Sequence, residues 1–242
     1  MFVVAKSDVG MTRKENQDRF CVKIIDDKTV AAVVCDGMGG AQSGGVASEI
    51  AANTVFDRIT LNYRNDADDN SIRNTLITSL TAANTLVYEK AKEDEDKKGM
   101  GTTCIGALIN KDKAYIASVG DSRAYLLDEN GISQITNDHT IVEILYEQGK
   151  IEKDDKNKHE MSHIITKAIG TEPDIDPDYF ELELKENSII LICSDGLTNY
   201  CSDELIYSYV YNKELEKSLN DLINYAKDKG GKDNITVAII MN

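Results

Sequence analysis

Three aspartates stand at the ends of short apolar runs, where carboxylates from distant parts of a chain can be brought together. Asp36 and Asp195 each follow a run rich in β-branched residues, and a glycine follows each of them. Asp233 instead precedes the last apolar run. Such runs are typical of buried strands. If the last strand is antiparallel to the other two, its start lies beside their ends and the three carboxylates share one edge.

A cluster of carboxylates has a specific chemical use. Their charges repel one another, and gathering them is costly unless a cation lies between them. Ligands that offer only oxygen suit hard ions such as Mg²⁺ and Mn²⁺. A single Asp-Gly pair is most often a simple turn. Its recurrence after two separate apolar runs favours a metal site.

Glycines follow the first of these aspartates closely. Five of the nine residues 37–45 are glycine. The backbone there can turn sharply and bring its carbonyl groups close to a ligand. We predict that the preceding strand ends at Cys35 or Asp36 and that a helix begins near Ser43.

The composition limits fold and function. The chain has 242 residues and no Pro/Gly/Ser-rich linker, which predicts one domain, 1–242, with a sizeable core. A net charge of −15 argues against nucleic acid and anionic membranes as partners, although bound metals can reverse the local field for an anionic substrate. No signal peptide or membrane-spanning run is recognisable, and we expect a cytoplasmic protein.

The five cysteines are predicted to be reduced. Their number is odd, no CxxC spacing occurs, and Cys35 and Cys193 lie within apolar runs. Buried thiols are therefore favoured over disulfides and over a zinc knuckle.

The rest of the pattern alternates strands and helices. Apolar runs predict strands at 2–7, 20–25, 29–34, 102–109, 113–119, 123–127, 179–184, 188–193 and 235–240. Helical spacing predicts helices at 46–59, 72–91, 203–211 and 214–229, and a shorter one within 138–150. The three strands between 102 and 127 have short polar breaks, which predicts a meander. The polar segment at about 138–175 is predicted to be a flap.

Two loops carry further candidates. Arg13 lies in the polar loop after the first strand, and arginine is the side chain best shaped for a bidentate grip on phosphate. Asp18 lies near the end of the same loop. Asp121 is predicted at the tip of the second hairpin of the meander, from which it could reach the edge that carries the other carboxylates. Each of these residue types is, by itself, most often a surface or turn residue.

Two short motifs suggest other functions. Residues 159–163 match the HExxH pattern, in which two histidines one helical turn apart bind zinc in a protease. The flanking KDDKNK and IIT do not support the amphipathic helix that this motif needs, and no histidine follows His163. The glycine cluster suggests dinucleotide binding, but Gln42 stands where the third glycine of GxGxxG belongs, and no GxxxxGK[ST] occurs.

The ordered set of motifs resembles a known family. SDVGMTRKENQD, VCDGMGG, GTT, GDSRAY, NDHT, ITKAIG, CSDGLTN and GGKDNIT occur in the order found in the metal-dependent protein phosphatases of type 2C, in their bacterial form. The resemblance runs from about Ser7 to Val237. It implies an α+β fold, a four-layer α-β-β-α sandwich with two central, mainly antiparallel sheets and a metal site at one edge.

The resemblance implies a role for each core aspartate. Asp36 would bridge two ions, Mn²⁺ or Mg²⁺, and the carbonyl of Gly37 would bind one of them. Asp195 and Asp233 would bind the other. Asp18 would hold waters on the metals, which places it with Asp36 among the catalytic residues.

Substrate contacts and departures from the family pattern are also implied. Arg13 would clasp the substrate phosphate, and Asp121, with help from Asp195, would hold a third ion. Gln17 stands where many relatives have glutamate, so one metal would be held more weakly or through water. Met38 stands where eukaryotic relatives have a histidine proposed as general acid, so protonation of the leaving group would fall to water on the metals.

The implied function is that of a protein serine/threonine phosphatase. A water activated by two or three divalent ions would attack phosphoserine or phosphothreonine directly, without a covalent phosphoenzyme. The implied partners are phosphorylated proteins, the substrates of a cognate serine/threonine kinase, and a monomer is expected. A catalytically silent relative that only binds remains the alternative from another class, and the presence of all three core aspartates argues against it.

Overall fold

The computed structural model describes residues 1–39, 43–93, 95–152, 155–156 and 159–242. Its strands are β1 (Phe2–Asp8), β2 (Asp18–Asp26), β3 (Thr29–Met38), β4 (Gly101–Thr102), β5 (Cys104–Asn110), β6 (Lys113–Val119), β7 (Arg123–Asp128), β8 (Gly131–Gln134), β9 (Asp178–Glu183), β10 (Ile189–Cys193) and β11 (Ile235–Met241). Its helices are α1 (Ser43–Asn62), α2 (Asp69–Lys92), α3 (Ile141–Glu147), α4 (Asp195–Thr198), α5 (Asp203–Val210) and α6 (Leu215–Asp228), with a 3₁₀ turn, η1 (Glu95–Lys97).

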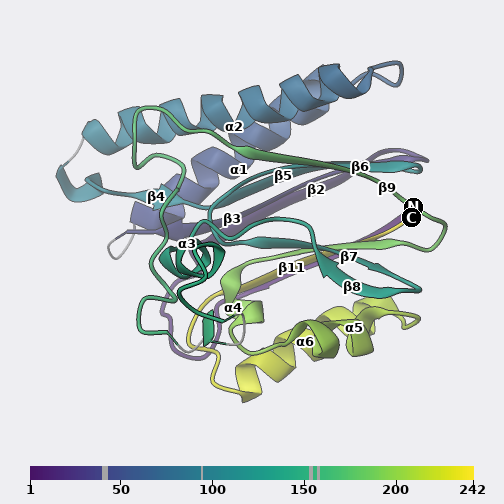
Figure 1. Cartoon of the computed structure of the whole chain (residues 1–242). Coiled ribbons are helices and arrows are strands. Elements are labelled where there is room, and N and C mark those ends of the chain that lie inside the picture. Colours follow the sequence, from purple (N-terminus) through teal and green to yellow (C-terminus); the bar gives the residue numbers. More distant parts are fainter. Residues whose placement is uncertain (40–42, 94, 153–154, 157–158) are drawn as a thin grey trace.

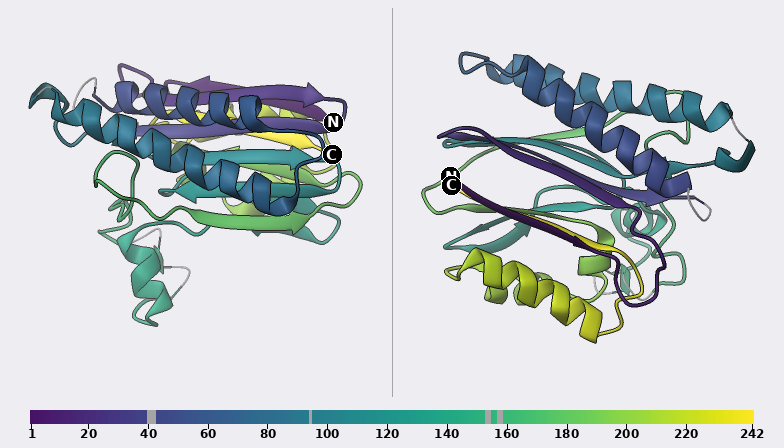
Figure 2. Two further views of the ribbon diagram at one scale, coloured as in Figure 1. Left: turned by 90° about the horizontal axis from the view of Figure 1, so that it is seen from above. Right: turned by 180° about the vertical axis from the view of Figure 1, so that it is seen from behind.

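Two antiparallel sheets lie face to face between layers of helices (Figure 1). Sheet A has the order β1-β11-β10-β7-β8, and sheet B has the order β2-β3-β5-β6-β9, with β4 paired to β3. Helices α1 and α2 cover the outer face of sheet B, and α5 and α6 cover the outer face of sheet A (Figure 2). The predicted α-β-β-α sandwich is confirmed.

Strand β3 shows why the layers form. Its side chains point alternately to opposite faces, as in any strand. Ala31, Val33 and Cys35 pack in the core beneath α1 and α2. Val30, Ala32 and Val34 pack in the core between the two sheets. Both faces are buried, which explains why this segment is a continuous apolar run.

The helices bury one apolar face each. Leu76, Leu80 and Ala83 of α2 recur every three or four residues and are fully buried against sheet B. Leu222 and Ala226 of α6 pack in the same way against sheet A. The starts of α2, α5 and α6 are capped by Asp68, Ser202 and Glu214, whose side chains accept backbone N–H groups.

The predicted meander between 102 and 127 is wrong in its last strand. Strands β5 and β6 pair in sheet B, but β7 pairs with β10 and β8 in sheet A. The turn between β6 and β7 is therefore a crossing from one sheet to the other and not a hairpin. Gly120, at φ +108°, takes a backbone conformation that other residues rarely adopt. Asp121 lies in this crossing.

Strand β3, which leads into the glycine cluster, is longer than predicted. Strand β3 continues to Met38, because Gly37 and Met38 pair with Thr102 and Gly101 of β4. Asp36 is thus inside a strand and not at its tip. Helix α1 begins at Ser43, as predicted, whereas the glycine-cluster position Gln42 lies outside the described residues.

The chain ends and the predicted flap occupy opposite ends of the molecule. Phe2 pairs with Met241, so both termini lie together at one end of sheet A (Figure 1). The segment at about 138–175 contains α3 and lies at the other end (Figure 2). In the described part of the chain, none of the helices has the length and apolar character needed to cross a bilayer.

Candidate metal centre

The layer between the two sheets changes from apolar to polar at one end. In β3, the residue two places beyond Val34 on the inter-sheet face is Asp36. By the same alternation, Asp18 lies on the inter-sheet side of β2. Ser194, directly after β10, and Thr236, in β11, lie on the inter-sheet side of their strands. Asp18 and Asp36 are direct cross-strand partners. Strand alternation therefore places these four polar residues together at the open end of the sandwich.

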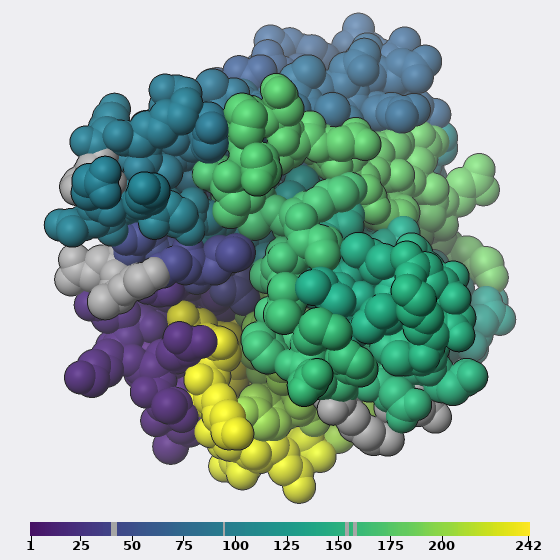
Figure 3. All heavy atoms as spheres, turned by 60° about the vertical axis from the view of Figure 1, so that its left-hand side comes forward, coloured from purple at the N-terminus to yellow at the C-terminus, as the bar shows by residue number. Residues whose placement is uncertain are grey.

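A cavity of about 740 Å³ opens above this polar layer. It is large enough to admit a phosphorylated side chain together with metal ions. Figure 3 shows this end of the molecule, with the purple N-terminal loop and the yellow segment before β11 facing the green flap segment across a hollow. The cavity is lined by Arg13, Lys14, Glu15, Gln17, Asp36, Gly37, Met38, Gly39, Asp121, His163, Ile165, Asp195, Asp233 and Asn234.

Asp18 lies in the floor beneath the cavity. Its Oδ2 accepts hydrogen bonds from Ser194 Oγ at 2.8 Å and from Thr236 Oγ1 at 2.7 Å, which joins sheet B to sheet A. Its Oδ1 is buried and has no hydrogen-bond partner among the described residues. Burial raises the pKa of Asp18 to about 7, against the effect of both hydroxyl groups.

The other carboxylates raise one another's pKa. Burial is the main cause for Asp36, whose pKa is raised well above its ordinary value, and Asp18 and Asp195 add to it by charge repulsion. Burial and the charge of Asp233 raise the pKa of Asp195. The pKa of Asp121 is raised to about 7 by burial and by Asp195. The aspartates are therefore close enough to act as one electrostatic cluster.

The glycines after Asp36 and Asp195 are required by close backbone packing. A Cβ atom on Gly37 would lie 2.2 Å from the carbonyl oxygen of Gly44 at the start of α1. A Cβ atom on Gly196 would lie 1.9 Å from the carbonyl oxygen of Asn234. The second contact brings α4 against the segment that carries Asp233. Both Asp-Gly pairs thus allow the carboxylates to converge.

One asparagine holds the N-terminal loop against the start of β11. The Asn234 Nδ2 group donates to the carbonyls of Val9 and Glu15, and its Oδ1 accepts the N–H of Gln17. Arg13 lies in the loop held in this way. Its Nη2 donates to Asp233 Oδ2 at 2.8 Å, and the arginine side chain is 55% exposed.

The crossing that carries Asp121 is held by a buried ion pair. Arg123 donates through Nε and Nη2 to both oxygens of Asp138, with distances of 2.6 to 3.0 Å. His139 Nδ1 accepts the N–H of Gly120 at 3.0 Å, and burial lowers the pKa of this histidine. The motifs GDSRAY and NDHT therefore fold against each other, which fixes the position of Asp121.

Comparisons with known proteins identify the family of this chain. The family model for protein phosphatase 2C matches residues 12–237. This chain belongs to the protein phosphatase 2C family. It is therefore an enzyme, a protein serine/threonine phosphatase that hydrolyses phosphorylated proteins.

Several relatives match the chain over nearly its whole length. The serine/threonine phosphatase stp of Listeria welshimeri is 34% identical over 238 residues, covering 97% of this chain and 93% of the relative. Protein phosphatase PhpP of Streptococcus pneumoniae is 32% identical over 243 residues, covering 97% and 94%. The crystal structure of serine/threonine phosphatase Stp1 from Staphylococcus aureus has a TM-score of 0.92 at 33% identity, covering 99% and 94%.

Type 2C phosphatases are metal-dependent enzymes, and the donor groups of this chain fit hard divalent ions. Two buried carboxylate oxygens, Asp18 Oδ1 and Asp195 Oδ1, have no hydrogen-bond partner in the described part of the chain. Within the same ranges, no three His, Cys, Asp or Glu side chains surround a single point closely enough to hold an ion. Carboxylate and backbone carbonyl oxygens are the donors that Mg²⁺ and Mn²⁺ prefer.

The predicted phosphatase site residues fall in two groups. Arg13, Asp36, Gly37, Asp121, Asp195 and Asp233 all line the cavity, while Asp18 lies directly beneath it. Gln17 and Met38, the two departures from the family pattern, also line it.

The predicted convergence of the carboxylates depends on strand direction. The strand that follows Asp233, β11, is antiparallel to β10, as expected, but β3 belongs to the facing sheet. The carboxylates therefore meet across the two sheets and not along one edge.

Three polar residues that support the carboxylate cluster were not predicted from the sequence. Ser194 and Asn234 each stand next to a predicted ligand, and Thr236 stands three residues after Asp233. Their proximity to the aspartates in CSDG and KDNIT was the available signal. Their partners lie more than 170 residues away in the chain, so the hydrogen bonds could not be inferred.

The zinc-protease motif does not form a zinc site. Residues 159–163 adopt turns and not the helix that HExxH requires. The preceding positions 153–154 and 157–158 lie outside the described residues. The Nδ1 of His159 accepts the N–H of Met161, and His163 lines the 740 Å³ cavity.

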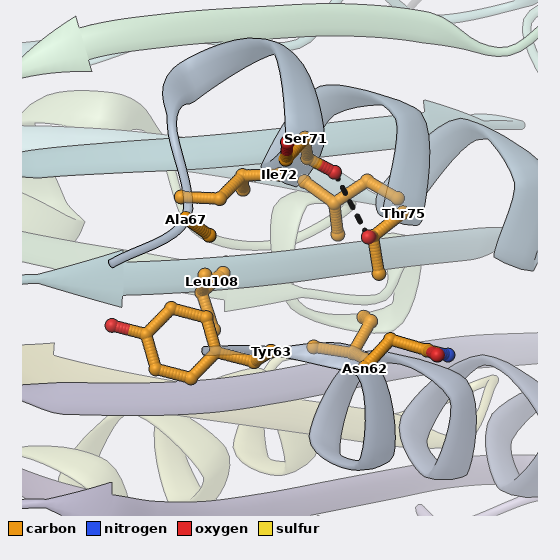
Figure 4. Close-up of a pocket in the computed structure, with 9 residues that line it drawn as sticks. Asn62, Tyr63, Ala67, Ser71, Ile72, Thr75 and Leu108 are labelled. Carbon is orange, nitrogen blue, oxygen red and sulfur yellow. Dashed lines mark hydrogen bonds between the residues drawn. The ribbon is translucent and has the colours of Figure 1, made fainter. Parts of the chain in front are cut away.

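A second hollow lies far from the carboxylates, between α1, α2 and β5. Its volume is about 30 Å³, and its lining includes Tyr63, Ile72 and Leu108. Figure 4 shows these side chains around the hollow, with Thr75 bonded to the backbone of Ser71 at 2.9 Å. This volume suffices for one or two water molecules and not for a substrate.

Proposed function

We propose that the phosphatase cleaves phosphoserine and phosphothreonine in the cavity at the open end of the two sheets, with Mn²⁺ or Mg²⁺ as cofactor. Two core ions would be held by Asp36, the carbonyl of Gly37, Asp195 and Asp233. A third would be held by Asp121 and Asp195. The observation that carries this proposal is the buried aspartate cluster, in which Asp18 Oδ1 and Asp195 Oδ1 have no protein partner among the described residues.

The cofactor and the protein supply different parts of the chemistry. When bound, divalent ions supply a water nucleophile of lowered pKa and neutralise phosphoryl charge, so no covalent phosphoenzyme is needed. Asp18 orients water at the floor of the cavity through its free oxygen. Arg13 leaves Asp233 and binds the phosphoryl oxygens of the substrate, for which its forked guanidinium is suited. These contacts hold the phosphorus in line with the nucleophile.

The proposal also covers the domain organisation, the flap beside the cavity and the binding partners. The chain acts as one catalytic domain, 1–242, and the segment at about 138–175 borders the cavity as a flap, because His163 and Ile165 line it. The partners are phosphoproteins, which a cognate serine/threonine kinase produces. The five cysteines are all free thiols, which supports action in the reducing cytoplasm. We propose a monomer.

Metal-dependent turnover tests the function. The full-length protein with Mn²⁺ is expected to release inorganic phosphate from phosphoserine and phosphothreonine peptides. Excess EDTA is expected to abolish the release, and added Mn²⁺ to restore it. A protein that binds the peptides without turnover would support the silent-relative alternative, and zinc-dependent cleavage of the peptide bond would support the protease.

Arg13→Ala is expected to raise KM for a phosphopeptide by about tenfold or more, because a charged hydrogen bond to ground-state phosphate is lost. The value of kcat is expected to fall less than kcat/KM. Steady-state kinetics with saturating Mn²⁺ measures both. Lys28→Ala is the control, because Lys28 is an exposed cation in the turn between β2 and β3, outside the residues that line the cavity. An unchanged KM in Arg13→Ala would contradict the role given to Arg13.

A further inference from the structure

The site so far lacks a protein group that can protonate the leaving oxygen. Serine and threonine leave as alkoxides, which are strong bases and poor leaving groups unless they gain a proton in the transition state. Met38 lines the cavity but carries no ionisable group. The aspartates of the cavity are given to the cations in the proposed site. The family resemblance assigns this proton to water on the metals, and a side chain elsewhere on the cavity wall is the alternative source.

One histidine faces the cavity. The chain has three histidines, and all three are described. His139 is buried, with Nδ1 bonded to Gly120 and Nε2 3.2 Å from Asp178. His159 uses Nδ1 to accept the N–H of Met161. His163 lines the cavity that also contains Asp36 and the other carboxylates.

His163 also lies where the cavity continues sideways. A smaller chamber of about 70 Å³ shares His163, Asp121 and Asp195 with the main cavity. The histidine thus stands at the junction of the two spaces, on the flap side. Its side chain is exposed, so its ring can exchange protons with solvent between turnovers.

The backbone around His163 is fastened to the start of α3. The Ile164 carbonyl accepts the N–H of Ile141 at 3.0 Å, and the Ile164 N–H donates to Met161 at 3.1 Å. Ile165 forms a β-bridge with Thr140. These bonds flank the histidine on both sides. The ring is therefore presented to the cavity by a fixed backbone and not by a free loop.

We propose that His163 is the proton donor to the leaving serine or threonine oxygen. As the water oxygen forms its bond to phosphorus, the bond from phosphorus to the substrate oxygen breaks and leaves its electron pair on that oxygen. A ring nitrogen of His163 gives its proton to the same oxygen. The neutral imidazole then regains a proton from solvent. This inference rests on the proposed phosphatase function and names the acid for that reaction.

The leaving group provides a sharp test. His163→Asn keeps a polar side chain that donates hydrogen bonds but cannot transfer a proton. With a phosphoserine peptide and saturating Mn²⁺, we expect kcat to fall by roughly 10²-fold or more. With p-nitrophenyl phosphate, whose phenolate departs without a proton, we expect the loss to be at least about tenfold smaller. His159→Asn is the matched control and is expected to lose equally little on both substrates.

The outcomes separate this inference from the proposed function. If wild-type protein hydrolyses neither substrate, the phosphatase function itself fails. If wild-type protein is active and His163→Asn loses both activities by the same factor, or neither, then the histidine is not the acid. Circular dichroism and thermal unfolding confirm that both variants fold. A loss confined to the phosphoserine peptide supports the proposal.

Discussion

Asp36→Asn is expected to lower phosphate release by roughly 10³-fold or more, because one of the carboxylates proposed to hold the cations is lost and several kcal/mol of transition-state stabilisation are lost with it. The same variant is expected to be more stable than wild type in EDTA. Burial and its acidic neighbours raise the pKa of Asp36 well above its ordinary value. Its charged form therefore destabilises the folded, metal-free protein, and asparagine removes that charge.

The pH dependence of this stability follows from the direction of the pKa shift. A carboxyl group whose pKa is higher in the folded than in the unfolded state binds more protons when folded. Its stabilising contribution is present at low pH and is lost as the pH rises through the folded pKa. In EDTA, the advantage of Asp36→Asn over wild type is therefore expected to grow as the pH rises above the ordinary pKa of an aspartate.

Thermal unfolding in EDTA at several pH values, together with phosphopeptide kinetics in Mn²⁺, measures both effects. Asp57→Asn is the matched control, because Asp57 is an exposed aspartate on α1 outside the cavity. It removes one negative charge without changing the cluster. Near-normal turnover in Asp36→Asn, or lower stability than wild type in EDTA at pH 8, would contradict the proposed centre.

Gly37→Ala is expected to inactivate the enzyme and to lower the free energy of unfolding by about 1 to 3 kcal/mol. The added methyl group would lie 2.2 Å from the carbonyl oxygen of Gly44, which is backbone and cannot rotate away. Either β3 or the start of α1 must move. Because the Gly37 carbonyl lies in this contact and Asp36 is the preceding residue, displacement would misplace two of the proposed ligands.

Gly45→Ala is the control for Gly37→Ala. Gly45 lies in the first turn of α1, and the nearest atom to an added Cβ is 3.9 Å away, an ordinary contact. Alanine is expected to be neutral there, or to stabilise the helix by up to about 1 kcal/mol. Kinetics and denaturant unfolding of the two variants provide the comparison. Equal behaviour of the two would mean that the close packing of Gly37 against Gly44 is not required.

The carboxylates of the proposed centre lower the stability of the metal-free fold. Asp18, Asp121 and Asp195 each have a raised pKa because they are buried near other acids. A ligand that binds only the folded state stabilises it by mass action. Divalent ions bound by these carboxylates would therefore reverse a destabilisation that the protein carries without them. Acidic side chains buried close together violate the rule that buried charges are paired, and such violations are expected at functional sites.

The sequence by itself determined the elements and the chemical type of the site. Apolar runs and helical spacing placed most strands and helices within two residues of their observed bounds. The repeated Asp-Gly pairs pointed to Asp36 and Asp195, because each follows a run of apolar residues that the sequence makes visible. Period-two alternation also continues from Val34 to Asp36. Local pattern suffices for such features, since they depend on neighbouring residues alone.

Tertiary structure alone decided which strands face one another. Nothing in the short breaks around Asp121 distinguishes a meander from a crossing between sheets, because both turns use the same residue types. The bonds from Asp18 to Ser194 and Thr236 join segments more than 170 residues apart. The place of His163 on the cavity wall depends on where the flap packs against the start of α3. Such contacts arise from the burial of whole faces, which no local pattern encodes.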